Sequence, residues 1–372
     1  MTGRIRKYIV SAVFVLLPVL FLHAQQKRGK SRGIFKADFS IQTAYDDNVL
    51  KYSVKYLDRF MNRQDEGRFE MQTYDDLSVK MRLGMYYKAK WAGKRYTRIG
   101  GSYLRMQYAV NGFKSWDLYT LYLRQDLSRK TSLQATYQYL PYFYVRTYRD
   151  EDLVDIYGYE PRTFRPFEFS KEHYGLTFRT KFSKPGLSLR WDMGIHRYFH
   201  NEHFTEYDAG KYYSGVRLWF SASRKFKINT AYQYAYNDAE GTDEPGEDKR
   251  NSDDPDATFS ENKFSIKVTY NLPKWFHKRQ SIDLGGVYTL RGFNTEKNYR
   301  DDPTHAGRLD HIGAVSVQYS VRWNKRVKSG LFVHYNYRNS TNDGSEYYRE
   351  LLADEKNYNQ TLYGISFSYQ IF

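Results

Sequence analysis

The chain has 372 residues, a net charge of +16 and 68 aromatic residues, 38 of them Tyr. A mean hydropathy of −0.79 excludes a bundle of transmembrane helices, because each helix needs about 20 predominantly apolar residues. The aromatic content argues against disorder, and the absence of cysteine excludes disulfide scaffolds and thiolate sites. What remains is a large β-rich protein whose polar and aromatic residues occupy different faces.

The first 24 residues have the layout of a secretory signal peptide. Arg4, Arg6 and Lys7 precede an apolar stretch over 8–22, and Ala24 supplies a small residue at the expected cleavage point. We expect residues 1–24 to be removed on export and 25–33 to form a short basic periplasmic tail. An exported chain without further apolar helices can cross a membrane only as a closed barrel.

From residue 34 onward the sequence alternates with a period of two, which indicates strands with one apolar and one polar face. In 315–323, for example, Val, Val, Tyr, Val and Trp alternate with Ser, Gln, Ser and Arg. Each segment is long enough to cross a bilayer at a tilt. About 14 such segments are predicted: 34–45, 76–88, 96–110, 116–126, 132–146, 172–182, 187–198, 212–223, 227–237, 262–272, 281–291, 310–323, 329–338 and 359–372.

One segment, 96–110, changes phase part-way along. Its apolar series includes Tyr103 and then shifts to Leu104, so that residues formerly on one face continue on the other. A β-bulge is the simplest explanation, because one extra residue exchanges the two faces of a strand.

The connections between these segments alternate between long and short. Tight turns such as 183–186 and 324–326 follow every second strand, whereas long loops lie between the others, and 273–280 is intermediate. The long connections are 46–75, 111–115 (a short member of the class), 148–171, 199–211, 238–261, 292–309 and 340–358. Outer-membrane barrels show this asymmetry, with short periplasmic turns and longer extracellular loops.

The final segment, 362–372, alternates aromatic and polar residues and ends in Phe. In this it resembles the terminal strand that the barrel-assembly machinery reads in bacterial outer-membrane β-barrels of the porin-like superfamily. One departure is that Phe372 lies one step out of phase with Tyr363, Phe367 and Tyr369. The resemblance implies an all-β, transmembrane antiparallel up-and-down β-barrel over 34–372. It also implies location in the cell outer membrane of a Gram-negative bacterium, surrounded by outer-membrane lipid.

The strand face opposite the apolar series is expected to line the lumen, and it carries many more basic than acidic residues. The basic members are Lys36, Lys80, Arg82, Arg98, Arg124, Arg179, Lys181, Arg190, Arg217, Lys267, Arg291, Arg322 and Arg338. The acidic members are Asp38, Asp126, Asp192 and Asp283. We expect a pore for small polar solutes that favours anions or acidic oligosaccharides, because rings of Arg and Lys attract anions. The alternative is that the arginines pair with carboxylates and fix the shape of the barrel.

Three aromatic residues, Tyr86, Tyr122 and Trp219, fall in the same lumen-facing series and could stack on sugars. The other Tyr residues are expected mainly at the two membrane rims, where an apolar ring with a polar tip is favoured.

No catalytic motif, cofactor motif or phosphate-binding loop is present, so we expect neither an enzyme nor a cofactor protein. The best histidine cluster is His196, His200, Glu202 and His203, but strand positions four apart are about 13 Å apart, too far for one metal ion. The connection 238–261 is rich in acids without an EF-hand pattern; it could bind divalent cations or fold back onto the basic lumen. No metal site is therefore predicted.

The basic charge alternates along strands and does not form runs, which argues against nucleic acid as a partner. Two other functions remain open: an outer-membrane lipid or peptide hydrolase, and a non-conducting barrel whose extracellular loops bind a partner or surface polymer.

Overall fold

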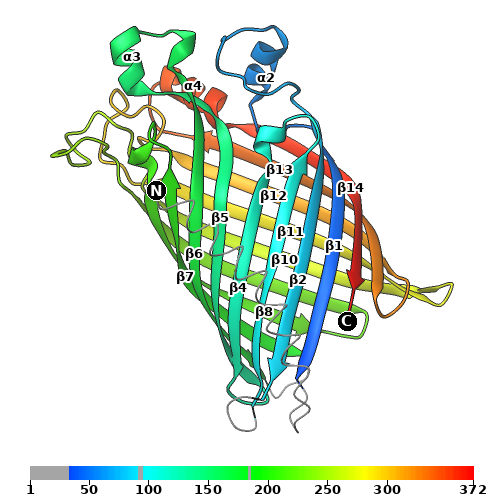
Figure 1. Ribbon diagram of the computed structural model, residues 1–372. Helices are drawn as coiled ribbons and strands as arrows, with labels where there is room; N and C mark the ends of the chain where they lie inside the picture. Colours follow the sequence, from blue (N-terminus) through cyan, green and yellow to red (C-terminus); the bar gives the residue numbers. More distant parts are fainter. Residues whose placement is uncertain (1–32, 91–94, 183–185) are drawn as a thin grey trace.

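The alternating segments fold into antiparallel strands that close into a barrel in the computed structural model, which describes residues 33–90, 95–182 and 186–372. Fourteen strands are present in these ranges, and each pairs with its neighbours in sequence (Figure 1). They are β1 (Ile34–Asp46), β2 (Asp76–Ala89), β3 (Thr97–Tyr108), β4 (Trp116–Asp126), β5 (Thr131–Arg149), β6 (Phe164–Lys181), β7 (Leu187–His200), β8 (Ala209–Ser221), β9 (Phe226–Ala239), β10 (Phe259–Trp275), β11 (Lys278–Phe293), β12 (Leu309–Arg322), β13 (Val327–Thr341) and β14 (Tyr358–Gln370). The predicted signal peptide and nearly all of the basic tail lie outside the described residues.

The barrel is closed by the pairing of β1 with β14, in which Asp38 lies opposite Gln370. Phe372 lies beyond the end of β14, and its ring centroid is 6.0 Å from that of Phe35 on β1. The terminal Phe therefore does not need to share the phase of the strand, because it packs across the closing seam instead.

The bulge predicted in 96–110 is wrong. β3 pairs with β2 and with β4 in continuous register throughout. Register shifts occur instead between β5 and β6, at Leu140/Phe143 and Tyr144/Arg146, and between β10 and β11, at Leu272/Trp275. Pro141 lies in the first of these intervals, where a residue without an N–H group cannot continue the ladder.

The phase change in β3 has a different cause, which is an apolar cluster at the end of the barrel that carries the long loops. Met106 and Tyr108 of β3 pack there against Val49, Leu50 and other residues of the β1–β2 loop. The apolar residues of the predicted series therefore lie on the outer face up to Tyr103 and on the inner face from Leu104. The inner face is apolar near this end of the barrel because the β1–β2 loop covers it.

All described helices lie in the long connections, at one end of the barrel (Figure 1). α2 (Val54–Met61) is in the β1–β2 loop, α3 (Glu151–Tyr157) in the β5–β6 loop and α4 (Glu346–Lys356) in the β13–β14 loop. The single turns η1 (Gly112–Lys114), η2 (Pro161–Thr163) and η3 (Thr205–Tyr207) lie in the β3–β4, β5–β6 and β7–β8 loops. None of the described helices is long and apolar enough to span a membrane.

Two connections differ most in length from the prediction. β10 and β11 continue until only Phe276 and His277 join them, and both residues have positive φ angles, of 46° and 59°. Positive φ at both central residues is the signature of the tight hairpin turn that matches strand twist. β5 and β6 also extend beyond the predicted segments, which shortens the loop between them to 150–163.

Candidate functional site: the lumen and its mouth

Five of the predicted basic residues form a row across neighbouring strands, close to the end with the short turns. Arg98 on β3 lies opposite Arg124 on β4; Arg190 on β7 lies between Arg179 on β6 and Arg217 on β8. We call these five residues the arginine row. The intervening strand β5 places small or neutral polar residues beside them, because Gln134 faces Arg124 and Ser132 faces Arg179.

Several hydrogen-bond donors of the arginine row have no acceptor among the described residues. The Nε atoms of Arg98, Arg179 and Arg217 are buried and have no hydrogen-bond partner among the described residues. Aromatic rings support the same guanidinium groups: Arg98 lies 4.5 Å from the ring of Tyr86, and Arg217 lies 5.7 Å from that of Trp219. A planar guanidinium held against a ring with free N–H donors is suited to binding carboxylates or phosphates.

Six of the thirteen predicted basic residues form ion pairs. The pairs and their N···O distances are Arg82–Asp38 (2.7 Å), Arg124–Asp126 (3.4 Å), Arg190–Asp192 (2.6 Å), Lys267–Asp283 (3.1 Å), Arg291–Glu261 (2.7 Å) and Arg338–Asp310 (2.5 Å). All four acids predicted for the lumen therefore pair with a predicted basic residue. These six ion pairs agree with the alternative interpretation, in which basic residues of the lumen pair with carboxylates and fix the shape of the barrel.

The other seven have no ion pair within the described parts of the chain. They are Lys36, Lys80, Arg98, Arg179, Lys181, Arg217 and Arg322. By strand parity these residues, like the six paired ones, lie on the face opposite the apolar series of their strands, although Ile34 at the start of β1 is exposed on the same face as Lys36. The excess of positive charge in the lumen therefore survives the pairing.

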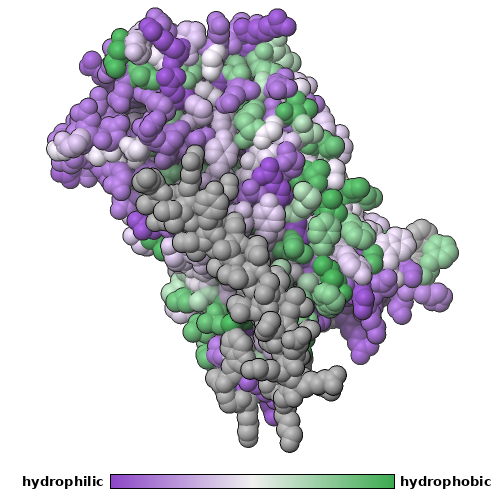
Figure 2. Space-filling view, viewed as in Figure 1, coloured by the Kyte–Doolittle hydropathy of each residue, from purple (hydrophilic) through white to green (hydrophobic). Residues whose placement is uncertain are grey.

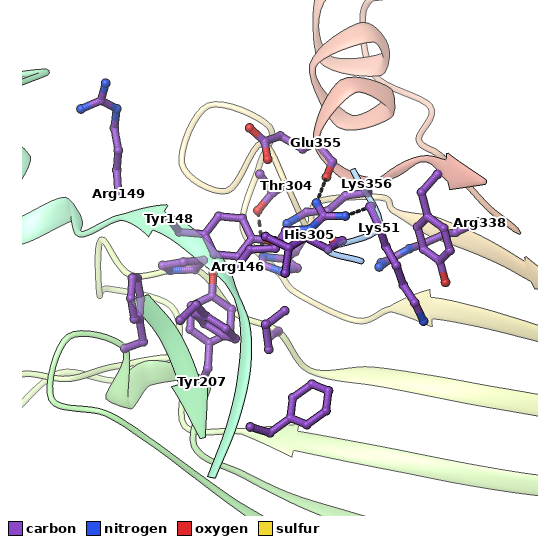
Figure 3. A pocket seen from close by; sticks show the side chains of 18 of the residues that line it. Lys51, Arg146, Tyr148, Arg149, Tyr207, Thr304, His305, Arg338, Glu355 and Lys356 are labelled. Carbon is purple, nitrogen blue, oxygen red and sulfur yellow. Dashed lines mark hydrogen bonds between the residues drawn. The ribbon is translucent and has the colours of Figure 1, made fainter. Parts of the chain in front are cut away.

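The mouth of the barrel contains a cavity of about 940 Å³ between the strand ends and the folded loops (Figure 3). Of the thirteen predicted residues only Arg291 and Arg338 line it. The other ionisable residues around it come mainly from loops and are nearly balanced in sign. The basic ones are Lys51, Arg68, Lys114, Arg146, Arg149, Arg308 and Lys356, and the acidic ones are Asp46, Asp150, Glu151, Asp152, Glu206, Asp243, Asp254 and Glu355. Unlike the lumen below it, the mouth has no strong excess of positive charge.

Arg146 of β5 holds two loops over this cavity (Figure 3). Its guanidinium donates to the backbone oxygen of Leu50 at 2.8 Å and to that of Lys51, both in the β1–β2 loop. A third N–H donates to the backbone oxygen of Glu355 in α4, also at 2.8 Å. One side chain thereby ties the first and last long loops to the barrel wall, and the β1–β2 loop narrows the mouth.

The β1–β2 loop is fixed from its first residues by side chains that satisfy backbone groups. The carboxylate of Asp46 accepts from the side-chain amide of Gln360 on β14 at 2.8 and 2.9 Å. Asn48 donates to the backbone oxygens of Tyr52 and Asn359, at 2.8 and 2.9 Å. Nothing in the alternation pattern indicated this role, because it depends on contacts between residues more than 300 positions apart.

The histidine cluster does not form one site. The ring of His196 stacks on that of His173, with centroids 4.4 Å apart, whereas His200 contacts Asp208 and His203 contacts Asp150. Carboxylates make up the groups of potential metal ligands found in the described residues, and no histidine belongs to them. His173 was not singled out from the sequence, and only the β6–β7 register places it beside His196.

The outer face of the barrel is apolar. Large apolar side chains at alternate positions are exposed on successive strands, among them Leu83, Leu123, Leu176, Val216, Ile266, Leu284, Val317, Val333 and Ile365. The predicted rim residues Tyr232, Tyr234, Tyr236 and Tyr335 are also exposed, whereas Tyr139 is buried. Figure 2 shows hydrophilic residues over the end with the helices and hydrophobic residues along the strands below it. An apolar belt around a closed barrel is stable only in lipid.

The molecule is a closed antiparallel β-barrel with an apolar outer belt. No family model matches the sequence, and none of the curated proteins matches it either. Solved structures with a similar course of the chain include a bacterial polysaccharide outer membrane secretin, with 7% identity over 90% of this chain and 98% of that one and a TM-score of 0.46.

Two further similar structures are OmpT of Vibrio cholerae and an anion-selective porin from Comamonas acidovorans. OmpT has 11% identity over 93% of this chain and 99% of its own, with a TM-score of 0.45. The porin has 7% identity over 92% of this chain and 100% of its own, with a TM-score of 0.44. The similarity is limited to the general barrel fold and gives no information about a solute.

Proposed function

We propose that this outer-membrane barrel is a pore for passive diffusion of small polar solutes, favouring anions or acidic oligosaccharides. The arginine row supports the proposal, because it concentrates five guanidinium groups on neighbouring strands. Among the described residues only Asp126 and Asp192, each on the same strand as its partner, form ion pairs with them. Such a wall raises the local concentration of anions and disfavours cations. The aromatic rings beside Arg98 and Arg217 suit solutes that combine a carboxylate with a sugar face.

Conductance across a planar bilayer tests the proposal directly. The purified barrel should give stepwise conductance, and the reversal potential under a KCl gradient should show that chloride permeates better than potassium. Absence of conductance, or a preference for potassium, would contradict it.

Substitution within the arginine row should lower the anion preference. We expect Arg179→Gln/Arg217→Gln to reduce the chloride-to-potassium permeability ratio several-fold, because neither residue has an acidic partner and the loss of each leaves no counter-charge behind. Arg129→Gln, an exposed residue of the β4–β5 turn, is the matched control and should leave the ratio unchanged. If Arg129→Gln lowered the permeability ratio as much as Arg179→Gln/Arg217→Gln, the arginine row would not be the cause of the anion preference.

A second candidate, a barrel whose extracellular loops bind a partner, is favoured by apolar side chains on the loop helices. Val54 of α2, Ile156 of α3 and Tyr347 of α4 are all exposed on the side of the molecule away from the membrane belt. This candidate predicts no solute conductance, and alanine substitution at the three positions should then abolish partner binding while leaving the barrel folded. The bilayer experiment therefore separates the two functions.

A further inference from the structure

Three carboxylates from two different loops converge beside the cavity at the mouth. Glu206 lies in η3 of the β7–β8 loop, and Asp243 and Asp254 lie in the β9–β10 loop. One oxygen of each residue lies within 4.8 Å of one oxygen of each of the others. These three residues, which we call the carboxylate triad, also line the cavity of the mouth.

The backbone holds the two loops together at the carboxylate triad. The amide of Gly241 donates to the backbone oxygen of Glu206 at 2.8 Å, and that of Glu240 donates to Asp208 at 2.8 Å. Gly241 has a φ of 69°, a conformation that glycine adopts without strain. Within the β9–β10 loop, Asp254 accepts from the amide of Asp243 at 3.0 Å and from the hydroxyl of Ser252 at 2.9 Å. The fold therefore fixes the backbone segments that carry the three carboxylates, and it fixes the carboxylate of Asp254 as well.

Glu206 shows that a ligand is missing from this arrangement. Only 5% of its surface is exposed, and its Oε2 atom is buried without a hydrogen-bond partner in the described parts of the chain. A buried carboxylate oxygen without a partner is costly, because the charge has lost its water and gained nothing in return. A hydrogen bond from the backbone of Glu206 itself favours the charged form of this carboxylate, but the charges of Asp254, Asp243 and Glu151 oppose it.

The electrostatics point the same way. Burial, followed by the charges of the neighbouring acids, raises the pKa of Glu206 from its ordinary value to about 9. Burial and the charge of Asp254 likewise raise the pKa of Asp243 to about 6. Without a cation these side chains repel one another, and a bound cation would reverse the sign of that interaction.

We propose that the carboxylate triad binds a calcium ion that joins the β7–β8 and β9–β10 loops at the extracellular mouth. Calcium is bound by carboxylate and carbonyl oxygens at about 2.3–2.6 Å, so two ligands on opposite sides of one ion are separated by about 4.6–5.2 Å. Three carboxylate oxygens that all lie within 4.8 Å of one another can contact one such ion together. Magnesium requires about 2.0–2.1 Å and therefore needs its ligands closer together.

A second group of carboxylates shares Asp254 and gives the experiment an internal comparison. Glu247, Asp253 and Asp254 also have oxygens within 4.8 Å of one another. Glu206→Gln removes a ligand from the carboxylate triad alone, and Asp253→Asn removes one from the second group alone. Asp254→Asn removes a ligand from both.

Titration calorimetry of the full-length barrel in detergent, freed of metal with a chelator and dialysed, tests the site with CaCl₂ as the probe. We expect saturable calcium binding by the wild type and weaker binding of MgCl₂. Glu206→Gln and Asp254→Asn should each lower calcium affinity by at least about tenfold. Glu240→Gln, an exposed acid of the same loop outside both groups, is the matched control and should bind like the wild type. Electrophoretic heat-modifiability shows that each variant has folded.

Limited proteolysis of the β9–β10 loop supplies a second readout, because an ion that joins two loops should slow cleavage within 240–257. Calcium should protect this segment in the wild type and in Glu240→Gln, but not in Glu206→Gln. Three results would overturn the proposal: no calcium binding by the folded wild type, equal binding by the wild type and Glu206→Gln, or loss of binding in Asp253→Asn alone. Each of these outcomes is independent of whether the barrel conducts.

Discussion

At the level of single residues, Lys114 is an ionisable side chain that its loop holds almost completely buried. The residue ends η1 in the β3–β4 loop, is 8% exposed and donates to the backbone oxygens of Tyr144 and Val145 at 2.5 and 3.3 Å. Burial lowers its pKa from 10.5 to about 7, and the positive charges of Lys51 and Arg146 act in the same direction, while Asp46 opposes them. Its charge is therefore lost as the pH rises through neutrality.

This titration predicts a pH-dependent selectivity if the barrel conducts. Lys114 lines the mouth, so the chloride-to-potassium permeability ratio should fall as the pH rises from about 6 to about 8, when the ammonium group loses its proton. The reversal potential under a KCl gradient measures this ratio at each pH. Lys114→Gln should flatten the dependence, and Lys225→Gln, in an exposed turn, should not. If Lys114→Gln keeps the full dependence, other groups at the mouth are responsible.

Single residues also mark the limit of sequence reasoning about the site. Strand parity was enough to predict Arg179 and Arg217 for the inner face, because the pleat fixes every second side chain. It could not show that Arg190 lies between them, since that depends on the register of three strands. The carboxylate triad could not be predicted from the sequence, because Glu206 and Asp254 belong to different loops and their spacing in the sequence follows no repeating pattern.

At the level of elements, the strands were predictable and the inward folding of the loops was not. Alternation located β12 and β14 to within two residues, because one face of each strand meets lipid and the other does not. The same logic misjudged β3, where loop residues cover the inner face and make it as apolar as the outer one. A loop such as 47–75 has no periodic pattern of apolar residues from which its position could be predicted. Its position depends on contacts with β5 and α4.

Arg146 should control the order of the β1–β2 loop. In Arg146→Ala the backbone oxygens of Leu50 and Lys51 lose a charged donor, and each such bond contributes about 1.5–3 kcal/mol. We expect faster hydrogen exchange over 48–61 and a larger single-channel conductance, because the loop can then leave the mouth. Arg162→Ala, which removes an exposed ion pair with Glu160 and a contact with the ring of Tyr157, should leave both unchanged. Unaltered exchange in Arg146→Ala would mean that the apolar cluster alone holds the loop.

At the level of the whole molecule, charge is distributed unevenly along the barrel. The arginine row lies near the short turns, whereas acidic residues gather in the loops around the mouth. The net charge of +16 is therefore a poor guide to what a solute meets first. If the barrel conducts as proposed, an anion that enters from outside would pass a nearly balanced mouth before it reaches the arginine row.

Because long-range charge is screened by salt, the selectivity of the barrel should depend on ionic strength. The Debye length falls from about 10 Å at 0.1 M salt to about 3 Å at 1 M. We expect the chloride-to-potassium permeability ratio to decline toward unity over this range, as measured from reversal potentials at a constant ratio of salt across the bilayer. A ratio that does not change would indicate selection by direct contact with the arginines and not by the field of the wall.

The seam between β1 and β14 has a consequence for biogenesis. Asp38 and Gln370 pair although 332 residues separate them, so closing this ring costs about 5 kcal/mol of chain entropy beyond a constant term. Until the last strand has been synthesised, the first has only one neighbour, and the growing sheet keeps two edges that would pair with any other strand. We therefore expect the chain to remain unfolded until all of its strands are available. A premature stop before residue 358 leaves an aggregation-prone open sheet and not a smaller barrel.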